Sequence, residues 1–225
     1  MTGATGTTAR TTATRTTGTT AAARYLYLAR HGEASPDESE LSERGRRQAA
    51  LLAERLRGAP LAAVHHGPLT RAAETARIVQ DRLSPDVPLE QSEEAGDYVP
   101  YLPGRDELPA EAADAMLERL ALFPPEEREP GPRLARAALA RFTGPVEGDE
   151  PRHELLVTHN FLIGWLVRDA LNAPPWRWMG LVHGNAALTV IRYAPGRPAS
   201  VLLYNDTGHL PEELRWTGFP PELRV

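Results

Sequence analysis

Short apolar runs of strand length alternate with amphipathic segments of helix length along most of this chain. Runs rich in aliphatic and aromatic residues are too short for helices, and each is bounded by polar or turn-forming residues. The strand-like segments are residues 24–29, 61–66, 87–90 and 153–159, and the helical ones are 41–58, 68–83 and 160–171. Alternation of strand and helix is typical of a parallel sheet covered by helices on both faces. The pattern therefore predicts a three-layer α/β fold with a mostly parallel central sheet.

The segment 41–58 shows how local signals support this prediction. Ser42 can accept a hydrogen bond from the first turn as an N-cap, and Gly58 follows the last turn. Apolar residues recur on one helical face at Ala49, Leu52, Ala53 and Leu56. The sequence thus predicts a helix that begins near Ser42 and packs that face on the sheet.

The two ends of the chain and its middle depart from the alternating pattern. Residues 1–23, "MTGATGTTARTTATRTTGTTAAA", have hardly any large apolar side chain and are expected to form a disordered tail. Residues 24–225 are expected to form one domain, with a helical insertion at about 90–145. Within that insertion, 90–109 is expected to be a long loop, followed by helices at 110–123 and 133–142.

The last part of the chain predicts two more strands and a surface segment. Residues 186–193 and 199–205 are apolar runs joined by the turn "APGRP", so we expect an antiparallel pair. The residues after them are rich in proline and charge, and we expect an extended surface tail.

Composition narrows the chemistry. The chain has no cysteine and no lysine, which excludes thiolate nucleophiles, disulfides and Schiff-base catalysis and leaves arginine as the permanent cation. No apolar run approaches the length of a membrane span, and the net charge of -5 does not favour nucleic-acid binding. We therefore expect a cytoplasmic protein that binds neither membrane nor nucleic acid; a homodimer is left open.

Polar side chains stand at the ends of several predicted strands. In parallel sheets ligands bind at the carboxyl ends of the strands. Arg30 and His31 follow the first strand, Arg71 comes one helical turn after the second, and His159 ends a later one. Guanidinium groups match phosphate oxygens, and an imidazole can accept a phosphoryl group. The set indicates phosphoryl transfer to His31 without a metal or an organic cofactor.

The motifs "LARHGEAS", "LSERGRRQA", "GPLTRAAETA" and "LLVTHNFLI", in this order, resemble the histidine phosphatase superfamily, also called the phosphoglycerate mutase-like family. The resemblance extends from residue 24 to the C-terminus. The C-terminal half, with "NDTGHLP", is similar to the mitochondrial serine/threonine phosphatase branch of that family.

The resemblance implies a role for each matching residue. His31 would be the nucleophile that becomes phosphohistidine. Arg30 and Arg71 would bind the phosphoryl oxygens, and His159 would donate a further hydrogen bond. The implied activity is hydrolysis of a phosphate monoester, with a phosphoprotein or a small phosphorylated metabolite as substrate.

The proton donor to the leaving group is open among three carboxylates in "EQSEEAGDY". Glu94 matches the family's acid best, and Glu93 and Asp97 are the alternatives. A general acid works best with its pKa near the working pH, so we expect Glu94 in a partly desolvated pocket near the phosphate.

Three residues are candidates for supporting positions around the site. Gly32 lets the backbone turn sharply and approach a ligand closely. His65 and His66 end the second strand; neighbours on a strand point to opposite faces, so they cannot easily share one metal ion. We expect one to face the pocket and the other to pack in the core.

Two other functions compete with hydrolysis. A phosphoglycerate-type phosphomutase would return the phosphoryl group to an organic product, but the short acidic segment "EASPDESE" after the RHG triplet favours a phosphatase. An inactive interaction module of the same fold is the second alternative.

Overall fold

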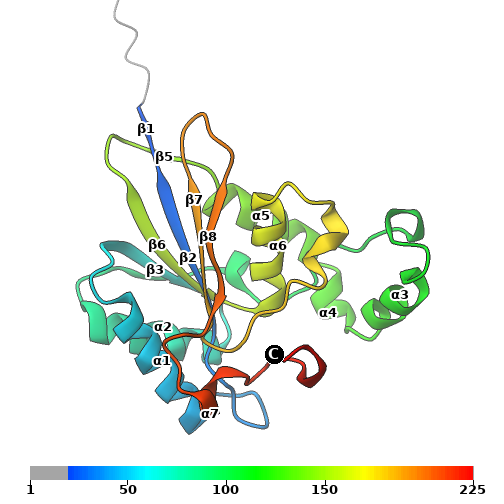
Figure 1. Cartoon of the computed structure of the whole chain (residues 1–225), viewed down its shortest axis with the longest axis horizontal. Helices are drawn as coiled ribbons and strands as arrows, with labels where there is room; N and C mark the ends of the chain where they lie inside the picture. Colours follow the sequence, from blue (N-terminus) through cyan, green and yellow to red (C-terminus); the bar gives the residue numbers. More distant parts are fainter. Residues whose placement is uncertain (1–19, 225) are drawn as a thin grey trace, which may run out of the picture.

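The computed structural model describes residues 20–224, and a six-stranded sheet forms its centre (Figure 1). The strand order is β4-β3-β6-β2-β7-β8. The bounds are β2 (Arg24–Arg30), β3 (Leu61–His66), β4 (Leu89–Gln91), β6 (Arg152–Thr158), β7 (Leu188–Tyr193) and β8 (Ser200–Asp206). Strands β2, β3, β4 and β6 are parallel, whereas β7 runs antiparallel to β2 and β8 antiparallel to β7. The predicted three-layer α/β class and the final antiparallel pair are confirmed.

Helices cover both faces of this sheet. The longer ones are α1 (Glu43–Leu56), α2 (Thr70–Leu83), α3 (Ala113–Ala121), α5 (Gly131–Phe142) and α6 (Asn160–Ala170). Helices α1 and α2 share one buried cluster with the sheet, which includes Leu52, Val64 and Val79. Helices α5 and α6 belong to the other cluster, with Phe142 and Leu166. The four parallel strands β2, β3, β4 and β6 have their carboxyl ends at one edge of the sheet, between these layers.

Helix α1 begins as its sequence predicts. The Ser42 hydroxyl accepts a hydrogen bond of 3.0 Å from the Gly45 amide. Gly32 also lets the helix approach the segment after β2, because a Cβ added to Gly32 would lie 2.5 Å from the Gly45 carbonyl oxygen. Such a contact is far shorter than van der Waals separation, so this close approach requires Gly32 to have no side chain.

The disordered tail predicted for residues 1–23 was too long, because its last part belongs to the fold. Ala21–Ala22 form strand β1, which pairs antiparallel with β5 (Val146–Glu147). Two alanines carry too little apolar area to predict a strand, but their backbone groups find partners in a segment more than 120 residues away in sequence. Residues 1–19 of the predicted tail lie outside the described residues.

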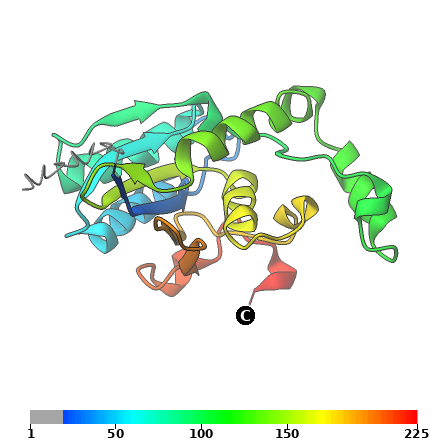
Figure 2. The same ribbon diagram turned by 90° about the horizontal axis from the view of Figure 1, so that it is seen from above.

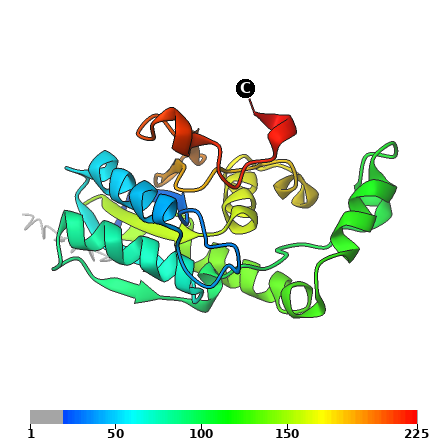
Figure 3. The same ribbon diagram turned by 90° about the horizontal axis from the view of Figure 1, so that it is seen from below.

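The middle of the chain projects from the rest of the molecule. Residues 90–145 contain two short 3-10 turns, η1 (Glu93–Ala95) and η2 (Arg105–Glu107), then α3, α4 (Pro125–Arg128) and α5. Figures 2 and 3 show α3 standing away from the sheet, on the side opposite α1 and α2. Helix α5 is a core element despite its place in this segment, because Ala135, Ala138 and Phe142 are buried.

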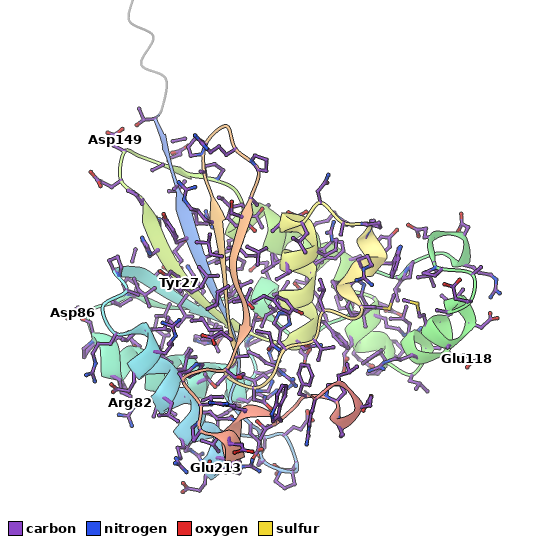
Figure 4. All side chains as sticks on the ribbon, in the orientation of Figure 1. Tyr27, Arg82, Asp86, Glu118, Asp149 and Glu213 are labelled. Carbon is purple, nitrogen blue, oxygen red and sulfur yellow. The ribbon has the colours of Figure 1, made fainter. Side chains whose placement is uncertain are left out.

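The C-terminal part is not the extended tail that its composition predicts. After β8 the chain forms α7 (Glu212–Arg215), with Leu214 buried, and ends in a turn of 3-10 helix, η4 (Pro221–Leu223). Figure 4 shows Glu213 near the N-terminal end of α1, and its carboxylate lies 3.4 Å from the Arg47 guanidinium. Arg44 and Gln48 of α1 donate hydrogen bonds to backbone carbonyls of α7, which favours the packing of this segment on α1. Hydropathy does not reveal such contacts. Within residues 20–224 no helix is long and apolar enough to cross a membrane.

One buried hydroxyl joins α2 to the segment after β2, and its removal should destabilise the fold. Thr75 Oγ1 accepts a 3.0 Å hydrogen bond from the Gly32 amide and donates one of 2.8 Å to the Arg71 carbonyl. Thr75→Val leaves that amide without a partner, so we expect the free energy of unfolding to fall by about 1–3 kcal/mol in urea denaturation. Thr75→Ser keeps the hydroxyl and should lose less. A valine variant as stable as the parent would contradict this role.

Candidate active site

His31 lies at the carboxyl end of β2 and is held by backbone groups on several sides. Its amide donates a 3.0 Å hydrogen bond to the Thr158 carbonyl at the end of β6. Its ring Nδ1 lies 2.7 Å from the Gly32 carbonyl oxygen, which can only accept. That contact assigns the proton to Nδ1 and leaves the lone pair on Nε2. The side chain is buried, with 6% of the residue exposed.

Arg71 and His159 approach the same ring from two other elements. Arg71, in the first turn of α2, directs Nε to His31 Nε2 at 3.3 Å. His159, the residue just before α6, places its ring centroid 4.9 Å from that of His31. The sheet order explains the meeting, because β6 lies between β2 and β3 and the three segments follow their carboxyl ends. The predicted association of these three residues is therefore present in the structure.

A carboxylate completes this cluster. Asp97 Oδ2 lies 3.0 Å from Arg71 Nη2 and 3.2 Å from His159 Nδ1. Burial alone would raise the pKa of Asp97, but the adjacent His159 and Arg71 outweigh it and hold the pKa below its ordinary value. Asp97 is thus ionised in the resting site and bridges the two groups that border His31.

The surroundings keep His31 neutral. Its pKa is well below the ordinary value, first because the ring is buried and then because His159 and Arg30 add positive charge nearby. A neutral imidazole with a free Nε2 lone pair is the form that can attack phosphorus. The positive charges that help to suppress protonation also favour an incoming anion.

Arg30 borders the cluster from its other side. Its Nη1 donates hydrogen bonds to the carbonyl oxygens of His183, at 2.8 Å, and Gly218, at 2.6 Å. Within residues 20–224 both hydrogen bonds of this side chain are on that one nitrogen, and Nε is buried without a hydrogen-bond partner. Burial lowers the pKa of Arg30, and the nearby Asp97 carboxylate opposes that shift.

The structure does not bring Glu94 into this cluster. Its carboxylate accepts a 2.5 Å hydrogen bond from Ser92 and lies 3.7 Å from Arg141 Nη1, on the α5 side. The Ser92 hydroxyl lowers the pKa of Glu94, contrary to the partly desolvated pocket expected for an acid. Both glutamates lie in the 3-10 turn η1, which directs Glu94 away from His31 and leaves Glu93 exposed to solvent. The chain after this turn brings Asp97 beside Arg71 and His159. The expected position of Glu94 was wrong; Asp97, one of the two alternatives, is the carboxylate that lies beside Arg71 and His159.

His65 and His66 pack separately. His65 stacks edge-on to Phe142, and its ring nitrogens lie 3.3 Å from Glu90 and 3.4 Å from Glu154. His66 Nδ1 lies 2.8 Å from the Gly67 carbonyl oxygen. Within residues 20–224 neither histidine forms a hydrogen bond or ion pair with the cluster around His31. In the part of the chain that the structure describes, no group of three or more histidines and carboxylates is arranged to hold a metal.

Two residues that the sequence did not single out bear on the site. Asn185 Nδ2 donates a 3.0 Å hydrogen bond to the His31 carbonyl. Glu127, in α4, has its pKa raised by burial and by the nearby charge of Asp97. An asparagine in a loop and a glutamate in an acidic run carry no local signal of function, so only the fold could reveal them.

A largely apolar groove begins at Asn160, the residue after His159. Its volume is about 470 Å³, and aromatic side chains of α6 and η3 (Pro175–Trp178) form one wall, while α3 and the C-terminal segment form others. The lining includes Met116, Phe123, Phe161, Trp176 and Leu223. A volume of this size suits the organic part of a small molecule or one or two side chains.

Comparison with known proteins agrees with this geometry. The model of the histidine phosphatase superfamily (branch 1) matches residues 26–207. A mitochondrial serine/threonine-protein phosphatase, Pgam5, from Caenorhabditis briggsae is 30% identical over 202 residues, which cover 87% of this chain and 68% of that protein.

Solved structures show the same fold. A mycobacterial glucosyl-3-phosphoglycerate phosphatase is 26% identical, with a TM-score of 0.57 over 82% of this chain and all of that one. A phosphoglycerate mutase from Plasmodium falciparum, 19% identical, has a TM-score of 0.56 over 85% of this chain and 96% of its own. The match to the family model spans most of the chain and contains His31, Arg71 and His159. The chain therefore belongs to the histidine phosphatase superfamily.

Proposed function

We propose that this protein hydrolyses phosphate monoesters through a phosphohistidine on His31. The observation that carries the proposal is the hydrogen bond of Nδ1 to the Gly32 carbonyl, which leaves Nε2 unprotonated beside Arg71. In the first step Nε2 forms a bond to phosphorus, and the bond from phosphorus to the ester oxygen breaks. In the second step water attacks phosphorus, the N–P bond breaks and inorganic phosphate leaves.

The positive groups around His31 supply the electrostatic part of catalysis. Charge spreads over the equatorial oxygens while the phosphoryl group moves, and donors fixed in a buried site stabilise it. Arg71 and Arg30 donate from opposite sides, and His159 donates from the end of β6. These arginines take the part that a metal ion has in other phosphatases, so we propose a reaction without metal or organic cofactor.

Asp97 is the proposed proton donor and, in the second step, the base that activates water. Its carboxylate contacts Arg71 and His159, whose donors an incoming phosphoryl group would share. When the dianion arrives, Asp97 loses part of its stabilisation and gains a negative neighbour, and both changes raise its pKa. Substrate binding thus prepares the carboxyl group to carry the proton that the ester oxygen requires.

The proposed substrates are phosphoproteins, with small phosphorylated metabolites as the second class. Relatives similar over most of this chain are named serine/threonine-protein phosphatases, whereas a solved structure of similar fold is a sugar-phosphoglycerate phosphatase. The apolar groove beyond Asn160 would hold the part of the substrate next to the phosphate. The proposed compartment is the cytoplasm, although those relatives are named mitochondrial; cell fractionation would test this.

The activity can be tested with a panel of phosphopeptides and small phosphate esters, measured by phosphate release in excess chelator. We expect inorganic phosphate as the product, an acid-labile phosphoryl group on His31 after rapid quenching, and loss of turnover by about 1,000-fold or more in His31→Ala. Transfer of the phosphoryl group to an organic acceptor would indicate a mutase. No turnover of any ester would favour the inactive interaction module.

The identity of the proton donor can be tested with leaving groups of different basicity. Asp97→Asn should slow release of an alkyl alcohol by about 100-fold or more and of p-nitrophenol much less, because a good leaving group needs little protonation. Glu94→Gln is the matched control and should change both rates little. If Glu127→Gln reproduced the alcohol-selective loss and Asp97→Asn did not, the donor would be Glu127.

The lowered pKa of His31 gives a pH prediction. A pKa below the ordinary value means that the neutral form persists as the pH falls through about 6.5, and the nucleophile is lost only at lower pH. The acid limb of kcat/KM should therefore lie below pH 6.5. An imidazole nitrogen NMR titration, with His31→Ala to assign the signal, measures the pKa directly. Titration of His31 at 6.5 or above would contradict the proposed environment.

A further inference from the structure

Hydrogen bonds hold the segment Leu214–Gly218 against the end of the sheet that carries His31. Gln48 of α1 donates hydrogen bonds from Nε2 to the Leu214 carbonyl, at 2.9 Å, and to the Thr217 hydroxyl, at 2.6 Å. The Thr217 carbonyl accepts from the Asn185 amide at 3.0 Å. Gln48 is fully buried, and its Oε1 accepts from the Glu33 amide at 2.8 Å, two residues after His31. The segment is thus joined to the loop that carries His31.

These hydrogen bonds place the Gly218 carbonyl oxygen beside the Arg30 guanidinium. Gly218 accepts from Arg30 Nη1 at 2.6 Å, and the His183 carbonyl accepts from the same nitrogen at 2.8 Å. A guanidinium is planar and rigid, so two acceptors on one nitrogen fix the plane of the whole group. The orientation of the other edge of Arg30 then follows from the position of the Gly218 carbonyl.

A side chain at residue 218 would be strained and would collide with two neighbouring side chains. The φ of Gly218 is +65°, and an added Cβ would lie 2.2 Å from Asn185 Oδ1 and 2.8 Å from Arg30 Nη1. Asn185 is the side chain that bonds the His31 carbonyl. A side chain here would therefore displace both Arg30 and the residue that supports His31, although Gly218 itself is exposed.

We propose that Gly218 is a positioning residue whose carbonyl orients Arg30 for phosphate, so that the segment after α7 completes the anion site. The catalytic use of this contact rests on the proposed function. The contact itself bears only on how the site binds an anion. Nothing in the local sequence "RWTGFPP" indicates this, because the contact joins residues 188 positions apart.

The test compares two glycine variants by calorimetric titration with inorganic phosphate. Gly218→Ala should weaken phosphate binding by about tenfold or more, because a charged donor loses its aligned acceptor. Gly196→Ala is the matched control: Gly196 has a φ of +66° in the β7–β8 turn, and nothing lies within 4 Å of its added Cβ. The Gly196→Ala variant has the same strain of an alanine at positive φ but no contact with Arg30, so it should leave the phosphate affinity unchanged.

A double-mutant cycle shows whether Gly218 acts through Arg30. In an Arg30→Ala background, Gly218→Ala should change phosphate affinity less than twofold, because the group that it orients is gone. An effect that persists in full in that background would overturn the proposal, as would a Gly218→Ala affinity equal to that of Gly196→Ala.

A milder variant covers the case in which Gly218→Ala fails to fold. Thr217→Val removes the hydroxyl that Gln48 contacts, and it should weaken phosphate binding severalfold with cooperative unfolding retained. A folded Thr217→Val protein with unchanged affinity would then overturn the proposal. If phosphate binds as expected but no ester is hydrolysed, the positioning role stands and the proposed hydrolysis fails.

Discussion

The contact between the Arg71 guanidinium and Nε2 of His31 is the interaction on which the site depends. It places a permanent cation against the lone pair of a neutral imidazole, an arrangement that is unfavourable for protonation and favourable for an arriving dianion. The same guanidinium holds Asp97 as an anion through Nη2. Arg71 therefore acts together with burial and His159: burial and the neighbouring charges keep His31 unprotonated, and His159 and Arg71 hold Asp97 as an anion until a substrate competes for them.

This arrangement requires segments far apart in sequence to meet at one edge of the sheet. The order β3-β6-β2 brings the residues after three parallel strands side by side, and Gly32 removes the side chain that would keep α1 away. Thr75 then joins α2 to the backbone after β2. The C-terminal segment adds the final constraint, because its carbonyl fixes the plane of Arg30. The layered fold supplies rigidity, and short polar contacts at its edge supply orientation.

Much of this could be predicted from the sequence because it is encoded locally. The strand runs, the Ser42 cap and the residues at strand ends each depend on neighbours in the chain, and together they predicted the sheet and the meeting of His31, Arg71 and His159. Glu94 and Asp97 could not be separated in this way, because a single 3-10 turn decides which carboxylate lies beside Arg71 and His159. Strand β1 and the return of residues 214–218 depend on backbone partners distant in sequence, which hydropathy does not report.

Phosphoryl transfer at this site requires that one anion contact His31, Arg30, Arg71 and His159 at once. A crystal structure with bound tungstate or vanadate would show whether it does. We expect the metal-oxyanion within bonding distance of His31 Nε2, with its oxygens accepting hydrogen bonds from Arg30, Arg71 and His159. An anion bound elsewhere, or out of reach of Arg30 or His159, would show that these side chains do not form one phosphate site.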